Sequence, residues 1–176
     1  MIALFNTLGF EPKLVLFDLD GTLLDSLPDL YSASVSMANS LKMTPPSLAQ
    51  VEQWVGNGAA VLVQRVLANQ FQPVAADPRF DRALALFMDA YQHLASRQSR
   101  LYSGVESLLS ELHQHHVMQG VITNKPGRFT EPLLSKFGIL HYFDLVYSGD
   151  HFTEKKPHPM PLLKAAQQMG LSLEEC

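Results

Sequence analysis

Hydrophobic residues along this chain occur in two patterns, short continuous runs and longer stretches with helical spacing. The run Leu14–Phe17 is apolar throughout and ends abruptly at polar residues, which is typical of a strand buried on both faces. Val117–Asn124 and Phe143–Tyr147 are two further strand-like segments. Since helical patterns separate these strands, the chain is predicted to adopt an α/β fold with a Rossmann-like parallel sheet.

Seven segments are expected to be helical, because their apolar residues recur at helical spacing or because start and stop signals frame them. Ser26 followed by Pro28 and Asp29 marks the first helix start, with Ser26 as the N-cap. Residues 72–78 form a breaker region. The seven predicted helices are residues 27–42, 48–54, 59–71, 79–97, 105–115, 128–137 and 161–169.

The first two predicted strands lie far apart in the sequence. Thr123 follows Asp18 by 105 positions, whereas a strand–helix–strand unit needs only about 30 residues. The surplus is mostly helical and too long for a plain loop. We therefore predict an α/β core formed by residues 1–25 and 100–176, with residues 26–99 inserted as a separate helical domain.

Two carboxylates, Asp18 and Asp20, come directly after the first predicted strand. Side chains two positions apart on an extended chain point the same way, and reactive crevices in α/β sheets lie beyond the carboxyl ends of the strands. Gly21 is expected to turn the backbone sharply and leave nearby amides free. An ordinary acidic turn is the alternative interpretation of a bare Asp-x-Asp, but the full run through Thr22 is more specific.

The run Asp18–Thr22 resembles the first motif of the haloacid dehalogenase superfamily, Asp-x-Asp-Gly-Thr. The resemblance implies that Asp18 is a nucleophile that forms an aspartyl-phosphate, and that Asp20 is the general acid and base. Thr123 matches the second motif, a Ser or Thr that hydrogen-bonds the phosphate. Lys156 matches the third, a Lys that offsets charge between nucleophile and phosphate. In this family the inserted helices form a mobile cap over the active site.

Three further strings resemble the phosphoglycolate phosphatase branch of that superfamily. They are Trp54–Ala59, Thr123–Pro126 and Lys156–Leu163, and the resemblance extends from about Lys13 to Glu175. Their simpler interpretation is a helix-breaking loop and proline turns, but their occurrence in the expected order favours the family. The substrate-binding residues implied by the resemblance are Gly21, Thr22 and Asn124 in the core and Gly56, Asn57 and Gly58 in the cap.

The family also has a fourth motif, Gly-Asp-x-x-x-Asp after another strand, whose acids complete a Mg²⁺ site. Asp18 and the backbone carbonyl of Asp20 are the other implied metal ligands. The sequence stops at Leu173–Cys176, where that strand is expected, and Asp150 or Glu154 are the candidates to substitute. We therefore expect weak Mg²⁺ binding, little phosphatase activity and an incomplete sheet. Its apolar Leu14–Phe17 edge would then be open to self-association.

Composition restricts the classes of partner. The 176 residues carry a net charge of −4 without a basic block, which argues against a nucleic-acid partner. We find no apolar run of about 18 residues that would span a membrane, and Met1–Phe10 resembles a short extension rather than a signal peptide. The single Cys176 fits a reducing cytoplasm. His113, His115 and His116 lack the further ligands that a zinc site needs.

The sequence thus predicts a Mg²⁺-dependent phosphomonoesterase of carbohydrate metabolism that acts on a small phosphorylated metabolite, 2-phosphoglycolate foremost. Two alternatives stay open at this point. One is a sugar phosphomutase of the same superfamily, and the other is a non-catalytic binding or assembly module. A receiver-type phosphoacceptor is a third, weaker idea, since its aspartate would need a partner kinase.

Overall fold

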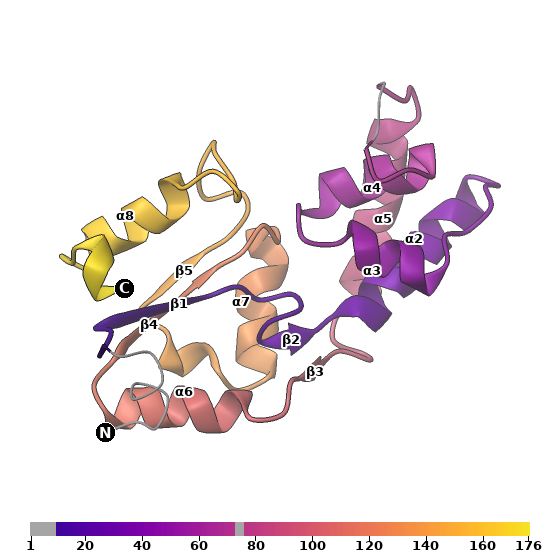
Figure 1. Ribbon diagram of the computed structural model, residues 1–176. Helices are drawn as coiled ribbons and strands as arrows, with labels where there is room; N and C mark the ends of the chain where they lie inside the picture. The colour runs from indigo at the N-terminus through magenta and orange to yellow at the C-terminus, as the bar shows by residue number, and fades with distance from the viewer. Residues whose placement is uncertain (1–9, 73–75) are drawn as a thin grey trace. The chain divides into compact units, whose positions relative to one another are not determined.

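The computed structural model describes residues 10–72 and 76–176, and the chain divides into two compact units (Figure 1). The core unit comprises the described residues up to Leu23 together with Leu101–Cys176, and the helical unit is Leu24–Arg100. Apart from Phe10, the predicted N-terminal extension lies outside the described residues. Each unit is considered by itself below.

The core unit is built on a three-stranded parallel sheet in the order β1-β4-β5. Leu14 pairs with Met118, and Gly120 pairs with Leu145. The three strands are β1 (Leu14–Phe17), β4 (Met118–Ile122) and β5 (Leu145–Tyr147). All three predicted strands and the α/β fold are therefore confirmed, although β4 and β5 are shorter than predicted.

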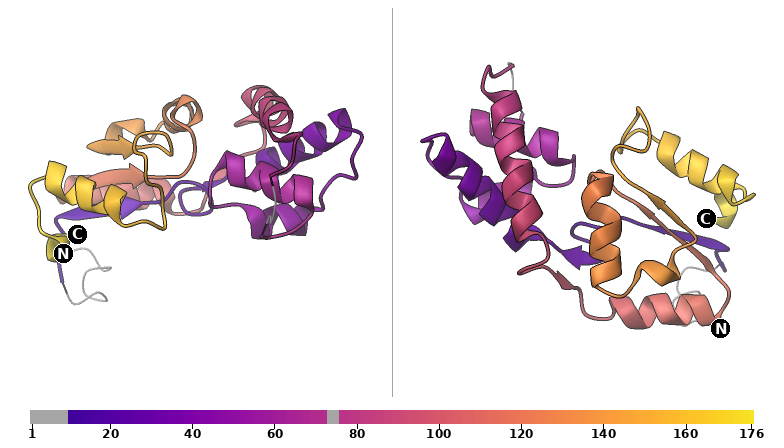
Figure 2. Two further views of the ribbon diagram at one scale, coloured as in Figure 1. Left: turned by 90° about the horizontal axis from the view of Figure 1, so that it is seen from above. Right: turned by 180° about the vertical axis from the view of Figure 1, so that it is seen from behind.

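Helices cover both faces of this sheet (Figures 1 and 2). Val15 and Phe17 pack against residues of α6, while Leu16 packs with residues of α8 and β5. Successive side chains of a strand point to opposite faces, so both faces of β1 are covered, with Leu14 fully buried and Val15, Leu16 and Phe17 half-buried. The helices of the core unit are α6 (Val105–Gln114), α7 (Gly127–Lys136), α8 (Met160–Gln168) and the short 3₁₀ helices η1 (Leu140–Tyr142) and η2 (Leu173–Glu175).

The helical unit is a bundle in which the first and last helices pack along each other. Met37 is fully buried, and the rings of Phe87 and Tyr91, one helical turn apart, stack with centroids 5.9 Å apart. The four helices are α2 (Leu27–Ser40), α3 (Leu48–Trp54), α4 (Ala59–Ala68) and α5 (Phe80–Leu94). All four correspond to predicted helices. Helices α2, α4 and α5 end two to three residues before their predicted ends.

A buried carboxylate joins the two ends of the helical unit. Asp29, in the first turn of α2, is fully buried. It accepts hydrogen bonds from the amides of Gln98 (3.0 Å) and Ser99 (2.9 Å) and from the Ser99 hydroxyl (2.5 Å). Three donors satisfy a charge that would otherwise be costly to bury. Asp29 therefore fixes the start of α2 to the segment that leaves the unit.

Some local details were not foreseen. Strands β2 (Leu24–Asp25) and β3 (Arg100–Leu101) form a two-stranded sheet that is too short to leave a periodic signal. Ser26 stands at the predicted N-cap position, but its backbone is αR and its side chain makes no capping bond to the helix. None of the helices in the described ranges is both long and apolar enough to cross a membrane.

Candidate active site

The two predicted catalytic carboxylates lie just beyond the carboxyl end of β1. Asp18 follows Phe17 directly, and its Oδ1 accepts the Leu19 amide at 2.8 Å. Gly21 adopts a φ of +82°, which favours glycine, and turns the chain back. The amides of Thr22 and Leu23 both donate to the Leu19 carbonyl, at 3.2 and 3.0 Å. The expectation of free amides at this turn was therefore wrong for these two, because the turn itself uses them.

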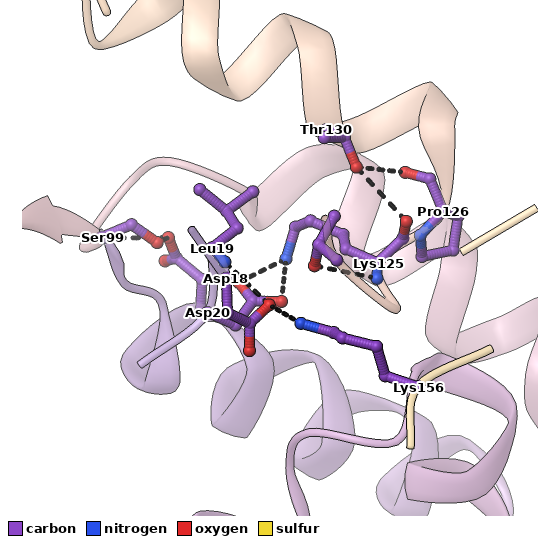
Figure 3. Close-up of polar contacts among 10 residues, drawn as sticks. Asp18, Leu19, Asp20, Ser99, Lys125, Pro126, Thr130 and Lys156 are labelled. Carbon is purple, nitrogen blue, oxygen red and sulfur yellow. Dashed lines mark hydrogen bonds and ion pairs between the residues drawn. The ribbon is translucent and has the colours of Figure 1, made fainter. Parts of the chain in front are cut away.

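Lys156 reaches Asp18 from the loop that precedes α8 (Figure 3). Its Nζ lies 2.9 Å from Asp18 Oδ1 and also donates to the Ile122 carbonyl at 2.5 Å. That carbonyl belongs to the last residue of β4. The ammonium is thus held by the sheet as well as by the carboxylate, with its side chain 24% exposed.

A second lysine, Lys125, forms a closer pair with Asp20. Its Nζ donates to both carboxylate oxygens, at 2.8 and 2.9 Å (Figure 3). The lysine side chain is only 2% exposed and that of Asp20 is 14% exposed. The sequence interpretation overlooked this residue, because a Lys before Pro126 looked like part of a turn. Lys125 directly follows Thr123 and Asn124, two predicted site residues, and this position in the sequence could have indicated that it also belongs to the site.

Thr123 and Asn124 hold the loops of the site together. The Thr123 amide donates to the carbonyl of Tyr147 at 2.9 Å, and its Oγ1 accepts the Lys125 amide at 3.2 Å. Asn124 donates its side-chain amide to the Lys156 carbonyl at 2.9 Å. Asn124 therefore connects the β4 loop to the lysine loop, and its predicted contact with substrate stays a prediction.

Asp18 is the more exposed of the two carboxylates of the site. A hollow behind Lys156, lined by Thr123, Asn124 and Gly149 among others, has a volume of about 10 Å³, which is room for about one water molecule. A phosphate ester is far larger than that. The Asp18 side chain is 36% exposed, so the nucleophile position itself is open to a ligand.

Comparison with known proteins identifies the family of this chain. The family model described as haloacid dehalogenase-like hydrolase matches residues 15–176. The chain belongs to this family. A phosphoglycolate phosphatase of Nitrosococcus oceani is 39% identical over 165 residues, which are 94% of this chain and 73% of that protein. A phosphoglycolate phosphatase of Pseudomonas putida is 43% identical over 168 residues, 95% of this chain and 61% of that protein.

Solved structures agree with the sequence relatives. A crystal structure described as a predicted phosphoglycolate phosphatase from Haemophilus somnus 129PT matches with a TM-score of 0.86 and 35% identity. The match covers 93% of this chain and 74% of that one. The predicted resemblance to haloacid dehalogenase-like hydrolases is therefore confirmed, and the relatives at about 40% identity carry the name of the predicted phosphoglycolate phosphatase branch.

Two of the metal ligands that the sequence resemblance implies belong to Asp18 and Asp20, just beyond β1. Asp18 and Asp20 supply hard oxygen donors, which suit Mg²⁺. Within residues 10–72 and 76–176, no group of three or more His, Cys, Asp or Glu side chains could hold a metal ion. Asp150, one candidate to complete the site, accepts the Gly127 amide at 2.9 Å at the start of α7.

The loop Gly56–Gly58 of this hydrolase belongs to the helical unit and is anchored by Arg65. The buried Arg65 guanidinium donates to the carbonyl of Trp54 at 2.6 Å and to that of Phe71 at 2.8 Å. Burial lowers the pKa of Arg65 from its usual value. Asn57 is exposed between the two glycines of the loop, both of which have positive φ. Substrate contact by this loop stays a prediction.

Proposed function

We propose that this haloacid dehalogenase-like hydrolase removes the phosphoryl group from small phosphomonoesters, with 2-phosphoglycolate as its main substrate. The observation that carries the proposal is the pairing of Asp18 with Lys156 at 2.9 Å beyond β1, with Asp20 two positions on. Phosphoryl transfer needs an in-line nucleophile, positive charge beside the phosphate and a proton carrier. The names of the relatives support the choice of substrate.

The proposed reaction has two steps on the residues of the core unit. A carboxylate oxygen of Asp18 forms a bond to phosphorus while the ester P–O bond breaks, and Asp20 gives its proton to the leaving alcohol oxygen. Water then attacks phosphorus, loses its proton to Asp20, and releases phosphate from Asp18. Lys156 offsets the charge between nucleophile and phosphate, and Thr123 hydrogen-bonds a phosphate oxygen.

Mg²⁺ is the proposed cofactor. Asp18 and the backbone carbonyl of Asp20 would hold it, and both Asp20 carboxylate oxygens are already engaged by Lys125, which favours the carbonyl as the donor. When bound, Mg²⁺ neutralises charge on the transferring phosphoryl group. The ammonium groups of Lys156 and Lys125 stand within 2.9 Å of the two carboxylates and already neutralise part of their charge.

Turnover of 2-phosphoglycolate at saturating Mg²⁺ tests the proposal, with phosphate and glycolate measured together at an enzyme concentration high enough to detect the slow turnover expected from weak Mg²⁺ binding. Asp18→Asn should reduce both to background and abolish labelling by beryllofluoride. Asp89→Asn is the matched control, because Asp89 is 79% exposed on the helical unit. Retained hydrolysis by Asp18→Asn would show that Asp18 is not the nucleophile.

The same assay separates the alternatives. Isomerisation of a hexose phosphate without release of phosphate would identify a phosphomutase. Binding of 2-phosphoglycolate without turnover of any ester would identify a non-catalytic module. Either result would overturn the proposed hydrolysis.

A further inference from the structure

Lys125 is an ionic partner of Asp20, although the proposed reaction assigns it no step. Its Nζ spans both oxygens of Asp20, the carboxylate assigned to proton transfer, at 2.8 and 2.9 Å. The two residues are 105 positions apart in the sequence. A lysine that is only 2% exposed has lost most of its hydration, so it requires an anionic partner. Asp20 is the partner that the core unit supplies.

The backbone of Lys125 is fixed as firmly as its side chain. Its amide donates to Thr123 Oγ1 at 3.2 Å, while its carbonyl accepts the Gly149 amide at 2.7 Å and the Thr130 hydroxyl at 3.3 Å. These contacts come from the loop after β4, the loop after β5 and α7. The ammonium is therefore presented from an immobilised segment, and it fixes the direction of the Asp20 carboxylate.

The two lysines of the site have different surroundings. Lys156 meets the nucleophile with its side chain 24% exposed, whereas Lys125 meets Asp20 with almost no exposure. Of the two lysines, Lys156 is therefore the more accessible to an incoming phosphate. Lys125 is almost fully buried and contacts Asp20, the carboxylate assigned as acid and base, so its effect on the reaction passes through Asp20.

We propose that Lys125 is a positioning residue that aims Asp20 at the leaving oxygen of the substrate. This inference rests on the proposed function. When Asp20 carries the proton, one of its oxygens turns to the substrate and the other keeps its contact with Lys125. Lys125 gives up no proton in either step. In the first step its contribution is therefore greatest for esters whose leaving alcohol must be protonated, whereas the second step, in which Asp20 takes a proton from water, is the same for every ester.

Leaving-group dependence is the test. The leaving group of 2-phosphoglycolate is an alkoxide that needs a proton, whereas p-nitrophenyl phosphate releases a stable phenolate. In Lys125→Met, kcat/KM for 2-phosphoglycolate, which reports the step in which the alcohol leaves, should fall about 10²-fold, the lower end of the range for general acid catalysis. The fall for p-nitrophenyl phosphate should be less than about 10-fold, because that leaving group draws little on the acid. Lys125→Arg should recover part of the loss, since a guanidinium also binds both carboxylate oxygens.

Controls separate positioning from a general structural role. Lys164→Met removes an exposed lysine on α8 and should leave both substrates unaffected. Adding Lys125→Met to Asp20→Asn should cause no further loss with 2-phosphoglycolate. Equal losses on the two substrates, or a further loss in the double variant, would overturn the inference. If Lys125→Met does not fold, the two substrates are compared in Lys125→Gln instead.

A second readout does not depend on turnover. A crystal structure of Lys125→Met, or of Lys125→Gln, should show the Asp20 carboxylate displaced from its position beside residue 125. A carboxylate that keeps its position would overturn the inference. If the unmodified protein turns over neither ester, the proposed function fails, and this structure still decides whether Lys125 aims Asp20.

Discussion

Gly149 lies so close to Asn124 that no side chain fits between them. A Cβ on Gly149 would stand 2.1 Å from the Asn124 carbonyl oxygen and 2.5 Å from its carbonyl carbon. The Gly149 amide also donates to the Lys125 carbonyl at 2.7 Å. The loop after β5 therefore rests directly on the segment that carries Thr123 and Lys125.

Gly149→Ala should disturb stability and the site together. The methyl group must push the two loops apart, and overpacking of this kind costs about 1–3 kcal/mol or more. Because Lys125 moves with its loop, kcat for 2-phosphoglycolate should fall as well. Denaturant unfolding and steady-state kinetics measure the two effects.

Gly170→Ala provides the matched control for that experiment. Gly170 has a φ of +70°, and a methyl group at this position would meet no other atom within 4 Å. Alanine there therefore costs about 1–2 kcal/mol through backbone strain alone. It should lower stability without changing kcat. A Gly149→Ala protein with unchanged stability and kcat would show that the loops tolerate the methyl group.

Asp29 should be a principal stabilising residue of the helical unit. Asp29→Ala leaves the amides of Gln98 and Ser99 and the Ser99 hydroxyl without their acceptor. Since one unsatisfied buried donor costs about 1–3 kcal/mol, we expect a loss of about 3 kcal/mol or more. Asp29→Asn keeps one oxygen acceptor and should lose less. Denaturant unfolding measures both.

The exposed Asp89 serves as the control for Asp29. Asp89 Oδ1 lies 3.8 Å from His93 Nε2, and both side chains are more than 70% exposed. Asp89→Ala should change stability by no more than about 0.5 kcal/mol. Equal effects at positions 29 and 89 would contradict a clamping role for Asp29.

Glu175 should make stability depend on pH in the acid range. The Lys13 ammonium at 2.6 Å, together with the amide and hydroxyl of Ser172, lowers the pKa of Glu175 from 4.5 to about 2. The unfolded chain therefore takes up a proton near pH 4.5 that the folded chain still excludes. The stabilisation is complete above pH 4.5, declines as the pH falls, and is gone below about pH 2.

NMR titration of the Glu175 side chain measures this pKa directly. The Glu175→Gln protein should be less stable than the unmodified protein at neutral pH, and the difference should vanish toward pH 2. High salt should reduce the difference, because the lysine side chain is 64% exposed and such pairs are screened. A midpoint near 4.5 for Glu175 would contradict the prediction.

Mg²⁺ binding should be weak and should compete with Lys156. An ammonium 2.9 Å from Asp18 Oδ1 repels a divalent cation at the same carboxylate. Lys156→Met should tighten Mg²⁺ binding by about tenfold, or about 1.4 kcal/mol, in a calorimetric titration. Lys164→Met should leave the affinity unchanged. A micromolar dissociation constant for the unmodified protein would contradict the expected weak binding.

The amino-acid pattern alone was enough to predict the three strands of the core sheet, the helices and the first carboxylates of the site. Leu14–Phe17 is apolar without interruption because both faces of β1 are covered, and local hydrophobic pattern reports such burial directly. The position of Asp18 and Asp20 follows from the same pattern, since polar residues mark the end of a buried strand. A recognisable motif then added Thr123 and Lys156.

How those residues meet could not be predicted from that pattern, because it depends on tertiary packing. Lys125 bonds both oxygens of Asp20 across 105 positions, and the Asn124 amide binds the Lys156 carbonyl rather than projecting freely. Asp29 and Ser99, 70 positions apart, form the buried clamp of the helical unit. Periodicity reveals which side of an element is buried, but it carries no information on which donor meets which acceptor. That choice depends on strand order, loop path and close approaches such as Gly149 to Asn124, which exist only after the chain has packed.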